Sequence, residues 1–175
     1  MILVLVGLHS QGFERLVKKM DEIATMINDE VIIQLGHTKY TPKYAKNFRF
    51  TDDKGVEELC KKADIVVTHG GAGSIMKALM YKKQVIAVPR LLKHSEARND
   101  HQLDIVDFFS KLGFLTAVYD INKLEEAIRL IKSGTARGGS YYSFGSEKEK
   151  LVDFIKLYLR HLESQKYGGT YWEKS

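Results

Sequence analysis

The stretch that decides the fold covers residues 63–79 and reads ADIVVTHGGAGSIMKAL. It begins as a short apolar run, is interrupted by Gly70, Gly71 and Gly73, and resumes with the apolar spacing of a helix. A glycine inside a regular element costs about 0.5–1 kcal/mol relative to alanine. The concentration of three glycines at this junction indicates that the backbone turns sharply there, passes close to another group, or does both.

Apolar runs of the same kind alternate with helical patterns along most of the chain. Continuous apolar strands separated by amphipathic helices are typical of a parallel sheet covered on both faces. With right-handed crossovers, this pattern predicts a Rossmann-like, doubly wound α/β domain. We predict strands over 2–6, 31–35, 48–50, 65–68, 85–88 and 115–119, and helices over 13–27, 56–63, 74–81, 99–112 and 124–131.

Composition narrows the class of protein. The chain has 175 residues, 44% of them hydrophobic, which suits one globular domain. Its net charge of +5 suits an anionic ligand or surface. Without an RNP-like strand, zinc-finger spacing or a basic helix, we expect no nucleic-acid partner. The first apolar run is too short to span a bilayer and lacks signal-peptide flanks, which favours a cytoplasmic protein. The lone Cys60 is expected in the core.

The chain divides by composition into three parts. Residues 1–132 form the predicted Rossmann-like domain, residues 133–146 a glycine- and serine-rich loop, and residues 147–175 a last helix and tail. This last helix either packs on its own sheet or docks on a second protein. Its apolar stripe consists of Leu151, Phe154, Ile155, Tyr158, Leu159 and Leu162.

The glycine loop suits a phosphate. In an open parallel sheet, ligands bind beyond the carboxyl ends of the strands, and His69–Gly73 lies at such an end. The next helix begins with free N–H groups and about half a positive charge. The sequence matches neither GxGxxG nor a P-loop, and a tight structural turn is the alternative.

Three further polar loops follow other predicted strands, over 7–12, 50–53 and 89–102. Since the carboxyl ends of parallel strands share one edge, we expect all four loops to lie together. The loop over 89–102 is rich in charged residues and histidine, which are suited to hydroxyl and phosphate groups.

Two stretches together resemble a known family. They are THGGAGSIMKAL at 68–79 and VIAVPRLLKHSEARNDHQLDI at 85–105. They resemble the donor-binding, C-terminal half of GT-B glycosyltransferases, and above all the small subunits of two-chain enzymes. Examples are the catalytic subunit of the dolichol-linked N-acetylglucosaminyltransferase and bacterial exopolysaccharide and capsule counterparts. The opening MILVLVGLHSQGFERLVKKMDE is similar to their VTVGTH-x-x-FDRLV start, and the resemblance extends to about Ile131.

The resemblance implies a donor that is a nucleotide-diphosphate sugar: UDP-GlcNAc, UDP-Glc or UDP-Gal. The loop over 69–74 would hold the diphosphate, the loop over 50–53 would flank the base, and the loop over 7–12 would close over the phosphates. Residues of the loop over 89–102 would contact the sugar and ribose. No metal and no cofactor are expected, because helix dipoles and basic groups stabilise the leaving group. The expected donor-binding residues are Gly7, Gln11, Gly12, Phe50, Thr51, His69, Gly70, Gly71, Ala72, Gly73, Ser74, Arg90, Lys93, Glu96, Asp100, His101 and Gln102.

Lys77 departs from the family pattern, which has an acidic or amide residue at this position. With Ser74 as N-cap, a glutamate there would complete a capping box. A lysine puts a cation at the positive end of the helix, at a cost of about 0.3–1 kcal/mol. Lys77 either extends into solvent or meets a phosphate. We expect Lys77→Glu to stabilise the fold if Lys77 is only a surface residue.

A GT-B enzyme needs two such domains, and this chain has room for one. The resemblance therefore implies a membrane-associated partner subunit that binds a lipid-linked acceptor and holds the chain at the cytoplasmic membrane face. The reaction would be an inverting sugar transfer, which needs a general base. His9 is the candidate base in this chain; alternatively it only hydrogen-bonds a phosphate or the backbone, and the partner supplies the base.

Two other functions stay open. The chain could be a non-catalytic enhancer of a partner transferase. The lysine at position 77 favours this function, whereas the intact DHQ motif at 100–102 argues against it. It could also be an epimerase-like or other nucleotide-binding protein, although a single domain lacks the cleft that such enzymes use.

Overall fold

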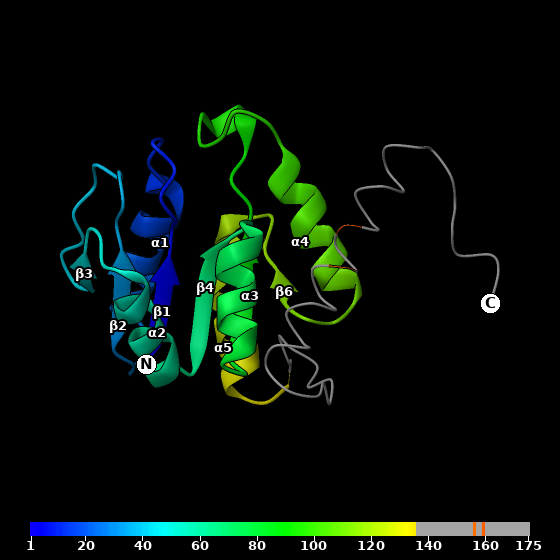
Figure 1. Cartoon of the computed structure of the whole chain (residues 1–175). Helices are drawn as coiled ribbons and strands as arrows, with labels where there is room; N and C mark the ends of the chain where they lie inside the picture. Colours follow the sequence, from blue (N-terminus) through cyan, green and yellow to red (C-terminus); the bar gives the residue numbers. More distant parts are fainter. Residues whose placement is uncertain (136–155, 157–158, 160–175) are drawn as a thin grey trace. The chain divides into compact units, whose positions relative to one another are not determined.

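The computed structural model describes residues 1–135, together with Lys156 and Leu159. The described residues form one parallel sheet with strand order β3-β2-β1-β4-β5-β6 (Figure 1). The order reverses between β1 and β4, as in a doubly wound fold, which confirms the predicted fold class. The strands are β1 (Ile2–Leu5), β2 (Val31–Gln34), β3 (Lys46–Phe48), β4 (Ile65–His69), β5 (Gln84–Val88) and β6 (Thr116–Ala117).

Helices cover both faces of the sheet. On one face Val4, Val67 and Ile86 share a buried cluster with residues of the helices over 14–24 and 124–132. On the other face the third helix packs against β4 and β5, and Figure 1 shows it in front of the sheet. The helices are α1 (Glu14–Ala24), α2 (Asp53–Lys62), α3 (Ala72–Met80), α4 (His101–Lys111) and α5 (Leu124–Lys132), with short 3₁₀ turns η1 (Leu92–His94) and η2 (Ile121–Lys123).

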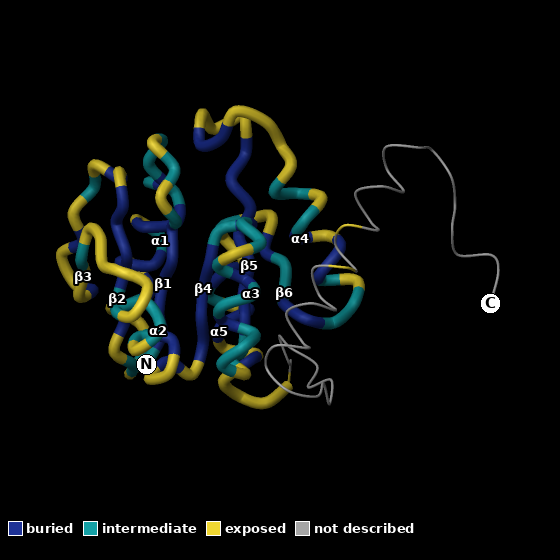
Figure 2. Tube along the Cα trace, viewed as in Figure 1, coloured by how far each residue is buried: buried dark blue, intermediate teal, exposed yellow. Residues whose placement is uncertain are grey.

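The carboxyl ends of the strands lie at the upper edge of the sheet in Figure 1. Figure 2 shows β1, β4 and β5 buried along their length, whereas the loops at this edge contain many exposed residues. The fold therefore leaves polar loops accessible at the one edge where ligands bind in open parallel sheets.

Several predicted boundaries are wrong. The third strand lies at Lys46–Phe48 rather than 48–50, and the sixth is reduced to Thr116–Ala117. Helix α3 begins at Ala72, so Gly71 is its N-cap and makes no side-chain capping bond. The predicted N-cap role of Ser74, and with it the capping-box reasoning about Lys77, is therefore wrong. Cys60 is fully buried, as expected.

The predicted loop over 133–146 falls within the described residues only as far as Thr135, and the stripe of the last helix lies outside them except for Leu159. Lys156 and Leu159 are helical and exposed. Within the described part of the chain, no helix combines the length and apolar character needed to cross a membrane.

Candidate functional site

Three loops meet at the point where the strand order reverses: 6–13 after β1, 70–71 after β4, and 89–100 after β5. This is the position at which doubly wound sheets bind nucleotides. The structure thus brings together three of the four loops that the sequence singled out as ligand-binding, and the hydrogen bonds that join these three do not include the fourth, over 50–53.

The ring of His69 lies between two glycines. A Cβ atom on Gly7 would lie 2.6 Å from His69 Cε1, and one on Gly71 would lie 2.3 Å from Nε2. Gly7 also has a φ of +77°, which disfavours a side chain. The close approach predicted for the glycine loop is thus present at Gly71, whereas the positive φ belongs to Gly7 in the loop after β1.

His69 is held as a neutral ring. Its Nδ1 lies 3.3 Å from the Leu5 carbonyl oxygen, to which it donates, so Nε2 carries the lone pair. Burial and, secondarily, the nearby Arg90 cation lower the pKa of His69 to about 4. At neutral pH, His69 therefore brings no positive charge to the site.

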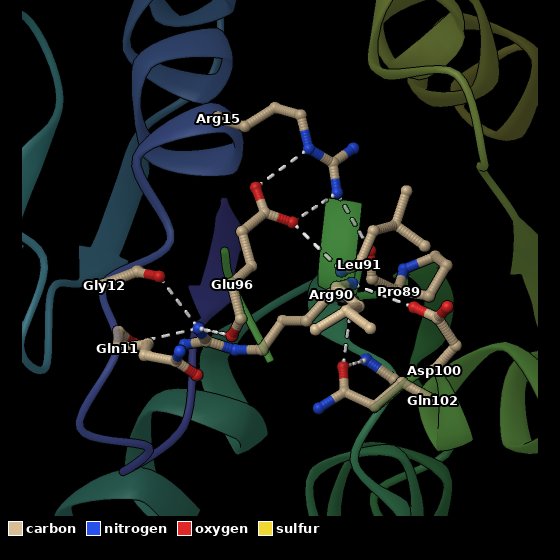
Figure 3. Close-up of polar contacts among 11 residues, drawn as sticks. Gln11, Gly12, Arg15, Pro89, Arg90, Leu91, Glu96, Asp100 and Gln102 are labelled. Carbon is tan, nitrogen blue, oxygen red and sulfur yellow. Dashed lines mark hydrogen bonds and ion pairs between the residues drawn. The ribbon is translucent and has the colours of Figure 1, made fainter. Parts of the chain in front are cut away.

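Gln102 ties two of the loops together. Its Oε1 accepts the backbone N–H groups of Gly70 and Arg90, each at 3.0 Å (Figure 3). Gly70 is packed so closely that a Cβ atom would lie 2.7 Å from Gln102 Cβ. The amide oxygen of Gln102 thus holds these two loops together.

Arg90 is 1% exposed and connects the β5 loop to the β1 loop. One terminal nitrogen lies 2.9 Å from the carbonyl oxygens of both Gln11 and Gly12 and 3.0 Å from that of Glu96. The other terminal nitrogen donates to the Val6 carbonyl at 2.8 Å. The guanidinium is thus directed at backbone oxygens and fixes the path of the β1 loop.

A second arginine extends from α1 to the loop after β5. Arg15 forms two hydrogen bonds with the Glu96 carboxylate, at 3.0 and 2.8 Å, and a third with the Pro89 carbonyl at 2.9 Å. The buried Glu96 carboxylate also accepts the Leu91 N–H at 3.2 Å. Figure 3 shows Arg15 at the carboxylate end of Glu96 and Arg90 at its backbone end.

Helix α3 presents an uncapped N-terminus at this edge. Its first N–H groups have no intrahelical acceptor, and Gly71 supplies no capping side chain. No atom of the described residues lies within 4 Å of a Cβ atom placed on Gly73. Protein packing therefore does not require a glycine at position 73, and the space beside the helix start is open to a ligand.

The other predicted site residues line the same edge with different exposure. His9 is half-buried, and its Nδ1 accepts the Gln11 N–H at 3.2 Å. Burial, followed by the charges of Arg90 and Arg98, lowers the pKa of His9. Asp100 accepts the Leu92 N–H at 2.9 Å. Ala72 and Ser74 are half-buried in the first turn of α3, whereas the exposed residues are Phe50, Thr51, Lys93, Asp100 and His101.

Lys77 forms an ion pair that the sequence did not suggest. Its Nζ lies 2.7 Å from Asp53 Oδ1 at the start of α2, and the lysine side chain is 23% exposed. Lys77 thus neither extends freely into solvent nor lies at the first turn of its helix. This ion pair removes the basis for expecting Lys77→Glu to stabilise the fold, because a glutamate would face the Asp53 carboxylate.

Sequence reasoning missed Arg15, Gln34 and Thr38. The Gln34 amide oxygen accepts the Gly7 N–H at 3.2 Å, and the Thr38 hydroxyl accepts the Phe13 N–H at 3.0 Å. A polar residue at the end of the apolar run 31–35 was the available signal for Gln34. Arg15 and Thr38 have no comparable signal in the sequence.

Comparison with known families now identifies the domain. Residues 1–157 match the glycosyltransferase family 28 C-terminal domain. The chain belongs to this family. The match confirms the resemblance to the donor-binding half of GT-B glycosyltransferases that the two motifs indicated.

Curated relatives cover about half of the chain. It is 27% identical over 95 residues to the UDP-N-acetylglucosamine transferase subunit ALG13 of Debaryomyces hansenii, and 28% identical over 101 residues to the human subunit of that name. These matches cover 54% and 55% of this chain but only 42% and 8% of the relatives. The chain thus spans less than half the length of either relative.

Solved structures share the fold. An NMR structure of ALG13 superposes with a TM-score of 0.54 at 18% identity, covering 78% of this chain and 87% of that one. MurG of Acinetobacter baumannii also gives 0.54, at 15% identity, over 74% of this chain and 40% of its own. At such identities, these likenesses establish the architecture alone.

Proposed function

We propose that this chain is the donor-binding subunit of a two-component glycosyltransferase that uses a UDP-sugar. The observation that carries the proposal is the uncapped start of α3, with open space at Gly73, placed at the strand-order reversal of a family 28 domain. A helix N-terminus at this place suits a diphosphate. UDP-GlcNAc is our first choice of donor, because the relatives are named as UDP-N-acetylglucosamine transferase subunits; UDP-Glc and UDP-Gal are the alternatives.

We assign the predicted ligands to two groups. One group would contact the donor: the α3 start over 71–74 for the diphosphate, Phe50 and Thr51 for the base, and the exposed Lys93, Asp100 and His101 for the sugar and ribose. The other group would hold the loops in place. In these residues the terminal nitrogens of Arg90, the carboxylate of Glu96 and the amide oxygen of Gln102 form hydrogen bonds within the protein.

The proposed reaction is an inverting displacement. The acceptor hydroxyl attacks the anomeric carbon of the sugar, its proton passes to a general base, and UDP leaves with the electrons of the broken glycosidic bond. Developing charge on the diphosphate would be stabilised by the helix start and nearby cations, without a metal.

The hydrogen bonding of His9 favours one of its two candidate roles. Its Nδ1 accepts the Gln11 N–H, so the neutral ring carries its proton on Nε2. In this state the ring has no free lone pair with which to take a proton, whereas Nε2–H can donate to a phosphate oxygen. We therefore assign His9 to the diphosphate and the general base to the partner.

The proposed partner is an acceptor-binding, membrane-associated subunit. The relatives are named as subunits, and in MurG the matching part is 40% of a longer chain. We propose that this partner binds the lipid-linked acceptor and holds the chain at the cytoplasmic face of the membrane.

Sugar transfer tests the proposal. The full chain would be co-expressed with the acceptor-binding subunit, and transfer of labelled sugar to lipid measured with UDP-GlcNAc, UDP-Glc, UDP-Gal and an ADP-sugar control. We expect transfer from UDP-GlcNAc only when both chains are present. Transfer by the partner alone, merely increased by this chain, would contradict the proposal and identify an enhancer.

A further inference from the structure

The loop framework contains two arginines and one buried carboxylate. Arg15 forms the ion pair with Glu96, and its side chain and that of Glu96 are 16% and 6% exposed. Arg90, 1% exposed, reaches Glu96 only through the backbone carbonyl. Two guanidinium charges thus share a single buried carboxylate, and this cluster carries an excess positive charge inside the protein.

The hydrogen-bond partners of Arg90 do not neutralise its positive charge. It donates to four carbonyl oxygens, which are dipoles rather than anions, and its Nε has no hydrogen-bond partner among the described residues. Within the described part of the chain, it is the one cation in the fully buried core. A buried charge is screened by solvent far less than a surface lysine would be.

The acidic groups around Arg90 are few. Besides Glu96, the carboxylate that acts on it is Glu14, which is half-buried and accepts the Lys39 N–H at 2.8 Å. On the ligand side lie His9 and His69, and burial, followed by the charge of Arg90, lowers the pKa of both rings. The field of Arg90 therefore extends to the loops at which the diphosphate is expected.

We propose that Arg90 is a positioning residue whose buried charge attracts the diphosphate of the donor from beneath the β1 loop, without touching it. This inference rests on the proposed function and deepens it. Arg90 would act in two ways: its hydrogen bonds fix the carbonyls of Gln11 and Gly12, and its charge makes the site attractive to anions. The Arg15–Glu96 pair would hold the loop that carries Arg90.

The test compares two ligands that share the base and ribose and differ in the charged diphosphate. Uridine and UDP would be titrated into the full chain by NMR chemical shifts, and the ratio of their dissociation constants measured for wild type, Arg90→Lys and Arg90→Met. Both variants lose the guanidinium hydrogen bonds, but the lysine variant keeps the charge. We expect Arg90→Met to reduce the preference for UDP over uridine by about tenfold, and Arg90→Lys by no more than about threefold.

A purely structural role gives a different result. Both variants lose the hydrogen bonds to the β1 loop, so a structural role predicts the same UDP-to-uridine ratio in Arg90→Lys as in Arg90→Met, and that outcome would overturn the inference. Where Arg90→Met does not fold, Glu96→Gln replaces it. Removing the buried negative charge is expected to raise the UDP preference, and a lowered preference would contradict the inference. If the wild-type protein prefers UDP but the UDP-to-uridine ratio does not differ between the two Arg90 variants, only the inference about Arg90 fails and the proposed function stands. If the wild-type protein binds neither ligand, both the inference and the proposed function are refuted.

Discussion

Replacing Gly73 with alanine should strengthen the fold and weaken donor binding. Gly73 lies in the first turn of α3, and an added Cβ atom meets no atom of residues 1–135 within 4 Å. Alanine is favoured over glycine in a helix by about 0.5–1 kcal/mol, so the free energy of unfolding should rise by up to that amount. For a domain of this size, the melting temperature should increase by about 1–4 °C.

The same methyl group would occupy the space in which the diphosphate approaches the helix start. Loss of one charge-assisted hydrogen bond costs about 1.5–3 kcal/mol, which raises the dissociation constant for UDP between about tenfold and a hundredfold. Calorimetric titration with UDP gives the affinity, and thermal unfolding without ligand gives the stability.

Gly70→Ala is the matched control. Its Cβ atom would lie 2.7 Å from Gln102 Cβ and 2.8 Å from the Gln102 carbonyl oxygen, so this variant should lose both stability and binding. A Gly73→Ala variant that is more stable and binds UDP as wild type does would show that the diphosphate does not lie at the start of α3.

Three further changes test the surrounding structure. Lys77→Glu should lower the free energy of unfolding by up to about 1 kcal/mol in urea titrations, because it replaces the ion pair with Asp53 by two facing carboxylates. The folded-state pKa of His69, about 4, lies below its unfolded value of 6.5, so only the unfolded chain takes up a proton between them. Stability should therefore fall as pH drops through this range, by no more than about 3 kcal/mol, and a His69→Gln variant should show a weaker pH dependence. Arg15→Met should destabilise the fold by about 3 kcal/mol, because it leaves the buried Glu96 carboxylate without its cation.

The surface pair Arg129–Glu125 provides the comparison for Arg15→Met. Its side chains are 59% and 28% exposed, so Arg129→Met should change the free energy of unfolding by less than about 0.5 kcal/mol. Equal effects of the two substitutions would show that the Arg15–Glu96 pair is no more than a surface contact. A Lys77→Glu variant as stable as wild type would likewise mean that the pair with Asp53 contributes nothing.

The sequence predicted the architecture because its signals are local. The apolar run before Gly70 and the helical spacing after Gly73 define β4 and α3, and the same alternation defines the other elements. Since parallel strands place their carboxyl ends at one edge, the grouping of the polar loops followed from the strand order. Boundaries shifted where the signal was weak, as at the edge strand β3 and at the start of α3.

The roles of the arginines could not be predicted in the same way. A charged residue in a polar loop is ordinarily exposed, whereas Arg90 is buried against backbone carbonyls that carry no sequence signature. Arg15 belongs to the pattern of α1, and its partner Glu96 lies 81 residues away along the chain. The predicted ligand list therefore combined exposed residues at the carboxyl edge of the sheet with residues that hold the loops.

The measurement that tests the account most directly is a thermal-unfolding titration of the full chain with UDP, alongside ADP and NAD. The account predicts stabilisation by UDP alone, reaching about 2.7 kcal/mol at 100 times the dissociation constant. Equal stabilisation by ADP, or no stabilisation by UDP, would contradict a uridine-diphosphate site at the carboxyl edge of this sheet.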